Sequence, residues 1–179
     1  GAAPHTVIPS GSPARSDVAA KFGTYSYLAT AGTSDYLSVT SHSDITFLTG
    51  AFTVDFWWRP TTIAIGRQTI ISAAVDGQWL GLSYMGSGAK LNLEVGGTWS
   101  SGGLADPNGI KTDYAADTWY HIAIVRGSSS SDEIKLYQNG VLDISYDQGS
   151  TSITSTSAMQ IFGKWGAPNT WYPSGYMDE

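Results

Sequence analysis

Apolar and polar residues alternate in short runs along most of the chain, which is the pattern of strands that bury one face. The clearest run spans residues 52–60 (FTVDFWWRP), where an apolar side chain occupies every second position from Phe52 to Trp58. Pro60 cannot donate to a hydrogen-bonding ladder, so we expect the strand to end there. Shorter runs of strand character span residues 21–29, 35–39, 69–74, 79–84, 90–95, 119–126, 134–138, 141–146 and 159–162.

The dipeptide Asn139-Gly140 separates two of these runs, IKLYQ and VLDI. A two-residue type I′ turn needs a positive φ at both positions, and Asn-Gly supplies it. The sequence therefore predicts a β-hairpin over residues 134–144.

No segment of ten or more residues shows helical spacing, and strands do not alternate with helices, so parallel βαβ units are not indicated. Aromatic residues make up 12% of the chain and charged residues 13%, which suits strands and turns. We therefore predict an all-β fold, an antiparallel two-sheet β-sandwich of the jelly-roll kind. Residues 1–20, rich in Ala, Pro and Ser, are predicted to be an irregular lead-in, and residues 21–179 to form the sandwich.

The formal net charge of −6 provides no basic surface for phosphates, so nucleic acid is not an expected partner. The chain has no cysteine, which excludes disulfides and thiolate metal sites. No apolar stretch approaches the roughly 18 to 20 residues of a membrane helix, so membrane insertion is not expected.

Several segments, in their order along the chain, resemble the laminin-G-like/pentraxin-like superfamily of concanavalin A-like jelly rolls. They are GTSDYLSV (32–39), FTVDFWWRP (52–60), TWYHIAIVR (118–126), IKLYQNGVL (134–142), MQIFGK (159–164) and GYMDE (175–179). The versions most similar to this chain occur in bacteriophage tail or fibre proteins and in secreted bacterial adhesins, which implies attachment to a surface.

The same resemblance implies a further strand before the segment that matches residues 1–6, and another after residues 178–179. We therefore expect this chain to be a piece of a longer one, with its two ends close together at incomplete sheet edges.

A related branch of this architecture hydrolyses β-glucans with two closely spaced carboxylates on one face of a strand. Asp132-Glu133 and Asp178-Glu179 are adjacent pairs, so their side chains point to opposite faces, while Asp55 and Glu94 each stand alone in a strand. The sequence therefore predicts that the protein is not an enzyme. His121 is interpreted as a structural histidine.

The resemblance also implies a structural calcium ion where the regions of Asp35 and Asp178 approach each other. Calcium takes six to eight oxygen ligands, which loop carboxylates and carbonyls can provide. Alternatively, Asp35 only shapes its turn and Asp178 only accepts backbone hydrogen bonds. Both interpretations remain open from the sequence.

Aromatic residues fall into two groups. One group lies within strands and is predicted to fill the core: Trp57, Trp58, Trp119, Tyr120 and Tyr137. The other lies among Gly, Ser, Asn and Pro in long loops and is predicted either to stack on sugar rings or to anchor an interface with a neighbouring chain: Trp99, Trp165, Trp171 and Tyr172.

These observations favour a recognition or adhesion module that binds a glycan or a cell-surface polysaccharide, located outside the cell or on a virion surface. The competing hypothesis is a purely structural virion or filament domain that packs against other subunits without a glycan ligand.

Overall fold

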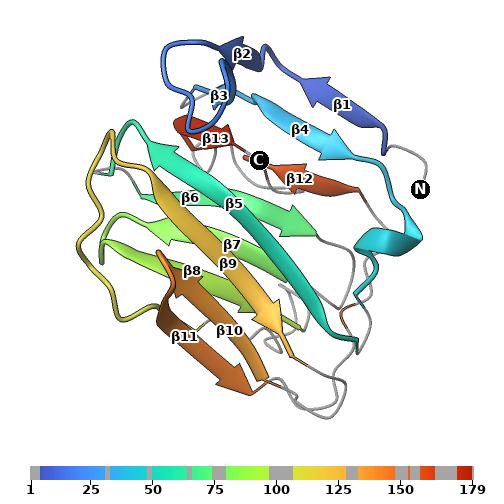
Figure 1. The fold of residues 1–179 in the computed structure, drawn as a ribbon, viewed down its shortest axis with the longest axis vertical. Helices are drawn as coiled ribbons and strands as arrows, with labels where there is room; N and C mark the ends of the chain where they lie inside the picture. The colour runs from blue at the N-terminus through green and yellow to red at the C-terminus, as the bar shows by residue number, and fades with distance from the viewer. Residues whose placement is uncertain are drawn as a thin grey trace.

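The computed structural model describes residues 5–30, 33–47, 50–63, 66–73, 80–96, 107–127, 133–147, 153, 158–163 and 173–178. Within these ranges the protein is an antiparallel sandwich of two sheets (Figure 1). The one helical element described is a short 3-10 turn, Ser43–Ile45. No helix in the described ranges is long and apolar enough to cross a membrane.

The first sheet has six strands in the order β1-β4-β12-β6-β7-β8. Their bounds are β1 Val7–Ser10, β4 Tyr36–Val39, β12 Met159–Ile161, β6 Arg67–Ala73, β7 Leu80–Met85 and β8 Lys90–Val95.

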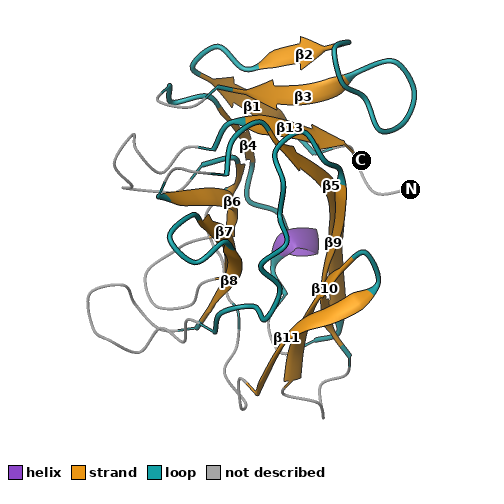
Figure 2. Ribbon diagram, turned by 90° about the vertical axis from the view of Figure 1, so that its left-hand side faces the viewer, coloured by secondary structure: helices purple, strands orange, loops and turns teal. Residues whose placement is uncertain are grey.

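The second sheet has seven strands in the order β11-β10-β9-β5-β13-β3-β2. Their bounds are β11 Val141–Asp147, β10 Glu133–Gln138, β9 Tyr120–Arg126, β5 Phe52–Pro60, β13 Gly175–Asp178, β3 Ser26–Ala29 and β2 Ala14–Ser16. Figure 2 shows β6, β7 and β8 in one layer and β5, β9 and β10 in the other. The predicted all-β fold class is confirmed.

The predicted hairpin is also confirmed. Gln138 pairs with Val141, and the two turn residues have positive φ, 50° at Asn139 and 76° at Gly140. The Asn139 side chain also accepts a hydrogen bond from the amide of His121 at 2.8 Å. This contact ties the turn to the neighbouring strand β9, so Asn139 serves both the turn and the sheet.

The core lies between the sheets, and the alternation of side chains along each strand decides which of them face it. On β5, the side chains of Phe56 and Trp58 are buried while Thr53 and Asp55 are exposed. The most completely buried apolar side chains come from both layers: Trp58, Ile70, Leu82, Tyr84, Leu91, Leu93, Ile122, Ile124, Ile134 and Leu136. An interior with these large side chains stabilises the sandwich mainly by removing apolar surface from water.

Two expectations about the ends of the chain need correction. The predicted irregular lead-in contains β1 and β2, which join opposite sheets at their edges. These strands are short and mostly exposed, so they leave little hydrophobic periodicity in the sequence.

The C-terminal strand β13 does not lie at an open edge, because it pairs with β5 on one side and β3 on the other. Gly1 and Glu179 lie outside the described residues, and the idea that the chain belongs to a longer one stays a prediction.

Candidate functional site: a pocket between the two sheets

Two rows of inward-facing side chains, fixed by strand register, diverge at one end of the sandwich. In the six-stranded sheet, Pro9 pairs with Leu37, and Leu37 with Ile161. In the seven-stranded sheet, Arg15 pairs with Tyr27, and Tyr27 with Met177. The second row continues inward to Trp58, which is fully buried. Toward β1 and β2 the facing side chains do not meet, and a space remains between the layers.

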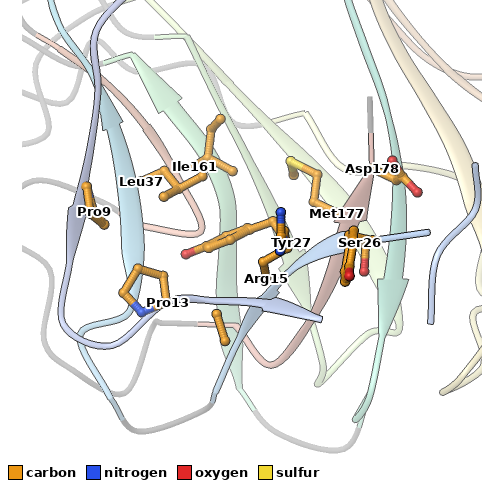
Figure 3. Close-up of a pocket in the computed structure, with 11 residues that line it drawn as sticks. Pro9, Pro13, Arg15, Ser26, Tyr27, Leu37, Ile161, Met177 and Asp178 are labelled. Carbon is orange, nitrogen blue, oxygen red and sulfur yellow. The ribbon is translucent and has the colours of Figure 1, made fainter. Parts of the chain in front are cut away.

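This space is a pocket of about 460 Å³ (Figure 3). Sites for small ligands commonly range from roughly 300 to 1,000 Å³, so the pocket is large enough for one. Figure 3 shows Tyr27 and Arg15 in its middle, with Pro9 and Pro13 toward one end and Asp178 at the other. The lining residues come from both sheets: Pro9, Pro13, Ala14, Arg15, Tyr25, Ser26, Tyr27, Leu37, Ile161, Met177 and Asp178.

Arg15 is the cation of the pocket. Its guanidinium carbon lies 4.0 Å from the centroid of the Tyr25 ring, a cation–π contact. Arg15 forms no ion pair with any described residue, and both Arg15 and Tyr25 are exposed at the rim. The guanidinium therefore keeps its hydrogen-bond donors available while the stacking contact holds its orientation.

Tyr27 crosses the pocket and is held from behind. Its ring stacks on Phe162 with centroids 5.4 Å apart. Its hydroxyl is buried without a hydrogen-bond partner in the described part of the chain. Burial, and secondarily the negative charge of Asp35, raise the pKa of Tyr27, so the phenol stays protonated. Tyr27 therefore gives the pocket a neutral aromatic surface.

Asp178 holds the loop that precedes β3. Its Oδ2 accepts hydrogen bonds from the amides of Lys21 at 2.7 Å and Phe22 at 3.0 Å. Asp35, which is buried before β4, accepts one from the amide of Ser12 at 2.7 Å. Each carboxylate therefore anchors a different connection around the pocket, β1 to β2 for Asp35 and β2 to β3 for Asp178.

The contacts of Asp178 match the interpretation in which it accepts backbone hydrogen bonds. Asp35 holds the amide of Ser12, 23 residues earlier in the chain, and a role in shaping its own turn stays a prediction. No group of three or more His, Asp or Glu side chains that could hold a metal gathers among the described residues. A calcium ion beside either aspartate would thus depend on carbonyl oxygens and water for most of its ligands. The calcium ion therefore stays a prediction.

Chelation tests that prediction. A bound ion stabilises the fold by mass action, so EDTA should lower the melting temperature and added calcium should restore it. The melting temperature can be followed by circular dichroism, with magnesium as the control ion. An unchanged melting temperature would leave Asp35 and Asp178 as loop anchors only.

The predicted sugar-stacking residues Trp99, Trp165, Trp171 and Tyr172 all lie outside the described residues. Their role therefore also stays a prediction.

The aromatics predicted to fill the core divide between two environments. Trp58 and Tyr120 belong to the buried cluster. Trp57 and Tyr137 are only half-buried, because both sit at outward positions of their alternating strands. Trp119 precedes β9 and is likewise half-buried. The core prediction is therefore wrong for Trp57, Trp119 and Tyr137, since strand alternation outweighs the general tendency of aromatics to be buried.

Trp57 instead centres a small cluster on the outer face of the seven-stranded sheet. The Lys21 ammonium lies 3.8 Å from the centroid of its indole ring, and the rings of Phe22 and His121 lie beside it, with centroids 5.9 and 5.2 Å away. His121 also contacts Asp55, with Nε2 3.3 Å from Oδ2. These contacts account for His121 in structural terms.

Glu94 lies on the outer face of the six-stranded sheet and is 1% exposed. It accepts a hydrogen bond from Ser83 at 2.9 Å and forms an ion pair with Arg67. A glycosidase needs a second carboxylate near the first, whereas the described partners of Glu94 are a hydroxyl and a guanidinium. These contacts are those of a buried structural charge.

Sequence reasoning missed the pocket and its cation. Arg15 stands in the segment predicted to be irregular, and its strand β2 has only three residues. The pocket itself arises only where the two sheets come together. The one local signal is the alternation of Tyr25 and Tyr27, which places both rings on one face of the chain.

Several solved structures superpose on this chain, and binding domains of toxins recur among them. The binding domain of Paraclostridial Mosquitocidal Protein 1 superposes with a TM-score of 0.74 at 16% identity, over 97% of this chain and 42% of that chain. Domain 4 of AbnA, an extracellular GH43 arabinanase from Geobacillus stearothermophilus in complex with arabinotriose, gives 0.70 at 19% identity, over 98% of this chain and 79% of that chain. The binding domain of botulinum neurotoxin serotype G gives 0.69 at 14% identity, over 97% and 41%.

At these identities the likeness shows the fold alone, and the chain spans less than half the length of the two toxin domains. No curated protein sequence matches the chain. A family model does match, over residues 31–179, and this range contains all the sandwich strands except β1, β2 and β3. The chain therefore belongs to the concanavalin A-like lectin/glucanases superfamily.

Proposed function

We propose that this protein is a non-catalytic recognition module that binds carbohydrate on a cell surface or in a polysaccharide, through the pocket between its two sheets. The observation that carries this proposal is the pocket itself, with its mostly apolar walls, its two tyrosine rings and an arginine without an ion pair among the described residues. Flat apolar rings beside a few polar groups are the usual composition of a site for a small ligand.

The relatives of known structure support the same proposal. Two of them are binding domains of toxins, and the third is a domain of a secreted enzyme with an arabinose oligosaccharide bound. An extracellular location follows from the proposal, and the setting is a secreted protein or a virion fibre.

The described polar groups favour binding over hydrolysis. Glu94 is held by Ser83 and Arg67, and Asp178 is held by two backbone amides. A carboxylate fixed in this way is a poor proton donor or nucleophile for a glycosidic bond. A reducing-sugar assay on polysaccharides that the protein binds should therefore show no product.

A glycan array with the purified chain tests the proposal against a purely structural role. Binding to a defined set of glycans, competed by the free sugar, is the expected result. A chain that binds no glycan but associates with other subunits of a fibre or filament would favour the structural role, because packing between subunits needs no sugar.

The aromatics of the long loops are a second proposed contact surface. Replacing Trp99, Trp165, Trp171 or Tyr172 singly by Ala should weaken glycan binding by about 5- to 150-fold, by analogy with base stacking on aromatic rings. Isothermal titration calorimetry measures this effect, and the melting temperature serves as the control for folding. Loss of assembly with unchanged glycan affinity would assign these rings to an interface between chains.

A further inference from the structure

Arg15 indicates which sugars the pocket selects, an inference that rests on the proposed function. Its direction is set by the fold, because Arg15 pairs with Tyr27 across β2 and β3 and the two therefore share the inner face. Tyr25 stands two residues before Tyr27 and faces the same way. The guanidinium thus stands over an aromatic ring at the exposed rim of an apolar cavity.

The donors of this guanidinium are not used within the described chain. Its contact is the Tyr25 ring at 4.0 Å, and a stacked guanidinium keeps its edge N–H groups free for a planar anion. Arg pairs with carboxylates by two parallel hydrogen bonds, which are stronger than bonds between neutral groups. The ring contact also reduces the freedom that Arg15 would lose on binding.

The rest of the lining limits the shape of the anion. Leu37, Ile161 and Met177 are apolar, so the ligand needs an apolar face next to its charged group. Asp178 is the other charged residue of the lining, and it lies at one end of the pocket (Figure 3). The buried Asp35 carboxylate holds Ser12 on the Pro9 and Pro13 side. A ligand carboxylate is therefore favoured directly against the Arg15 guanidinium rather than toward either aspartate.

We propose that this pocket binds an acidic sugar, a pyranose ring carrying a carboxylate, with the carboxylate paired to Arg15 and the ring packed against Tyr25 and Tyr27. The apolar face of a pyranose matches the two tyrosine rings, and the carboxylate matches the guanidinium. Because Arg15 lies at an exposed rim, the pair is expected to weaken as salt rises.

Inward-pointing charges on edge strands also protect sheets from pairing with other chains, and β2 is an edge strand. This role makes a different forecast. If protection were the purpose of Arg15, its removal would promote self-association and leave sugar affinity unchanged.

Matched pairs of sugars, differing in the carboxylate, provide the test. Galacturonic acid is compared with galactose, and glucuronic acid with glucose, by isothermal titration calorimetry on the full chain. The acidic member should bind more tightly in each pair. Arg15→Gln should reduce affinity for the acidic sugars by about 10- to 150-fold and leave neutral sugars nearly unchanged.

Two further variants serve as controls. Lys111→Gln removes the same charge from a loop held by β11, at the opposite edge of the sheet from β2, and should change affinity less than twofold. Arg15→Lys keeps the charge without the planar fork and should recover only part of the affinity. If Arg15→Gln fails to fold, Tyr25→Ala tests the same pair by removing the ring that orients the guanidinium.

The outcomes separate the two levels of the proposal. Equal affinity for acidic and neutral sugars, or an unchanged affinity in Arg15→Gln, would overturn the acidic-sugar assignment while leaving a carbohydrate-binding function in place. Absence of binding to every glycan on an array would instead overturn the proposed function itself. Self-association of Arg15→Gln by analytical ultracentrifugation, with full acidic-sugar affinity, would assign Arg15 to edge protection.

Discussion

Replacing Trp58 by Ala should destabilise the protein by about 3–5 kcal/mol, the usual cost of truncating a large aromatic side chain in a core. Trp58 is 0% exposed and joins three other rings, Tyr84, Tyr114 and Tyr120, with centroids 5.7, 5.9 and 6.1 Å from its own. Its loss would leave a cavity between the two sheets that these neighbours cannot fill. Urea unfolding followed by fluorescence or circular dichroism gives the free energy of unfolding directly.

Trp57 is the matched control, because it is the same residue type one position away on the same strand. It faces outward, and its described ring contacts are with Lys21, Phe22 and His121 at the surface. Trp57→Ala should cost about 1 kcal/mol, the scale of a surface cation–π contact with some lost packing. Equal destabilisation by the two substitutions would contradict the inward and outward assignment of β5.

Asp143→Ala should cost about 2–5 kcal/mol, because it leaves two part-buried amides and the buried Tyr114 hydroxyl without this acceptor. Asp143 is 1% exposed, and its Oδ1 accepts hydrogen bonds from the amides of Ile110 and Lys111 at 2.7 and 2.8 Å. Its Oδ2 lies 3.5 Å from the hydroxyl of Tyr114. Burial and the charge of Asp143 raise the pKa of Tyr114, so that hydroxyl stays protonated and can donate. Asp143 thus fixes the segment that brings Tyr114 into the core.

Asp113→Ala is the control for Asp143→Ala, since it removes the same charge at an exposed position of the segment that Asp143 holds. We expect its effect on the free energy of unfolding to stay within about 0.5 kcal/mol. Asp143→Asn keeps an acceptor for the two amides and should fall between the two Ala variants. A small effect of Asp143→Ala in denaturant unfolding would mean that the 107–117 segment is held by its other contacts.

The interior strands could be predicted from the sequence because their alternation is strong. The apolar run at 52–60 matches β5, and the Asn139-Gly140 turn fixes the register of β10 and β11. Each of these signals is local, since a strand with one buried face shows its period and a type I′ turn shows its residues. Their order along the chain then pointed to the family.

The candidate site could not be predicted in the same way. Arg15 and Tyr27 are adjacent only through the pairing of β2 with β3, and they face Leu37 only because the two sheets stack. Nothing in the local pattern around Arg15 distinguishes an edge strand from a loop. The sequence leaves the roles of Asp35 and Asp178 open for a related reason, because a loop anchor and a metal ligand use the same residue type.

Trp57 shows how two valid rules can conflict. Its position in the alternating run predicts an outward side chain, whereas its size and aromatic character predict burial. In the structure the position within the strand decides, because Phe56 and Trp58 already occupy the inner face on either side of it. Strand position is therefore the stronger guide within a well-formed alternating run.

The most direct test of a non-catalytic sugar site between the sheets is a nuclear magnetic resonance titration of the 15N-labelled protein with galacturonic acid or with a saccharide identified on the array. We expect shifts of the backbone amides of Arg15, Tyr25, Tyr27, Leu37 and Ile161 that saturate with sugar concentration, while the signals of the saccharide show that it remains intact. Saturating shifts that leave all five of these amides unchanged, or cleavage of the saccharide during the titration, would contradict this expectation.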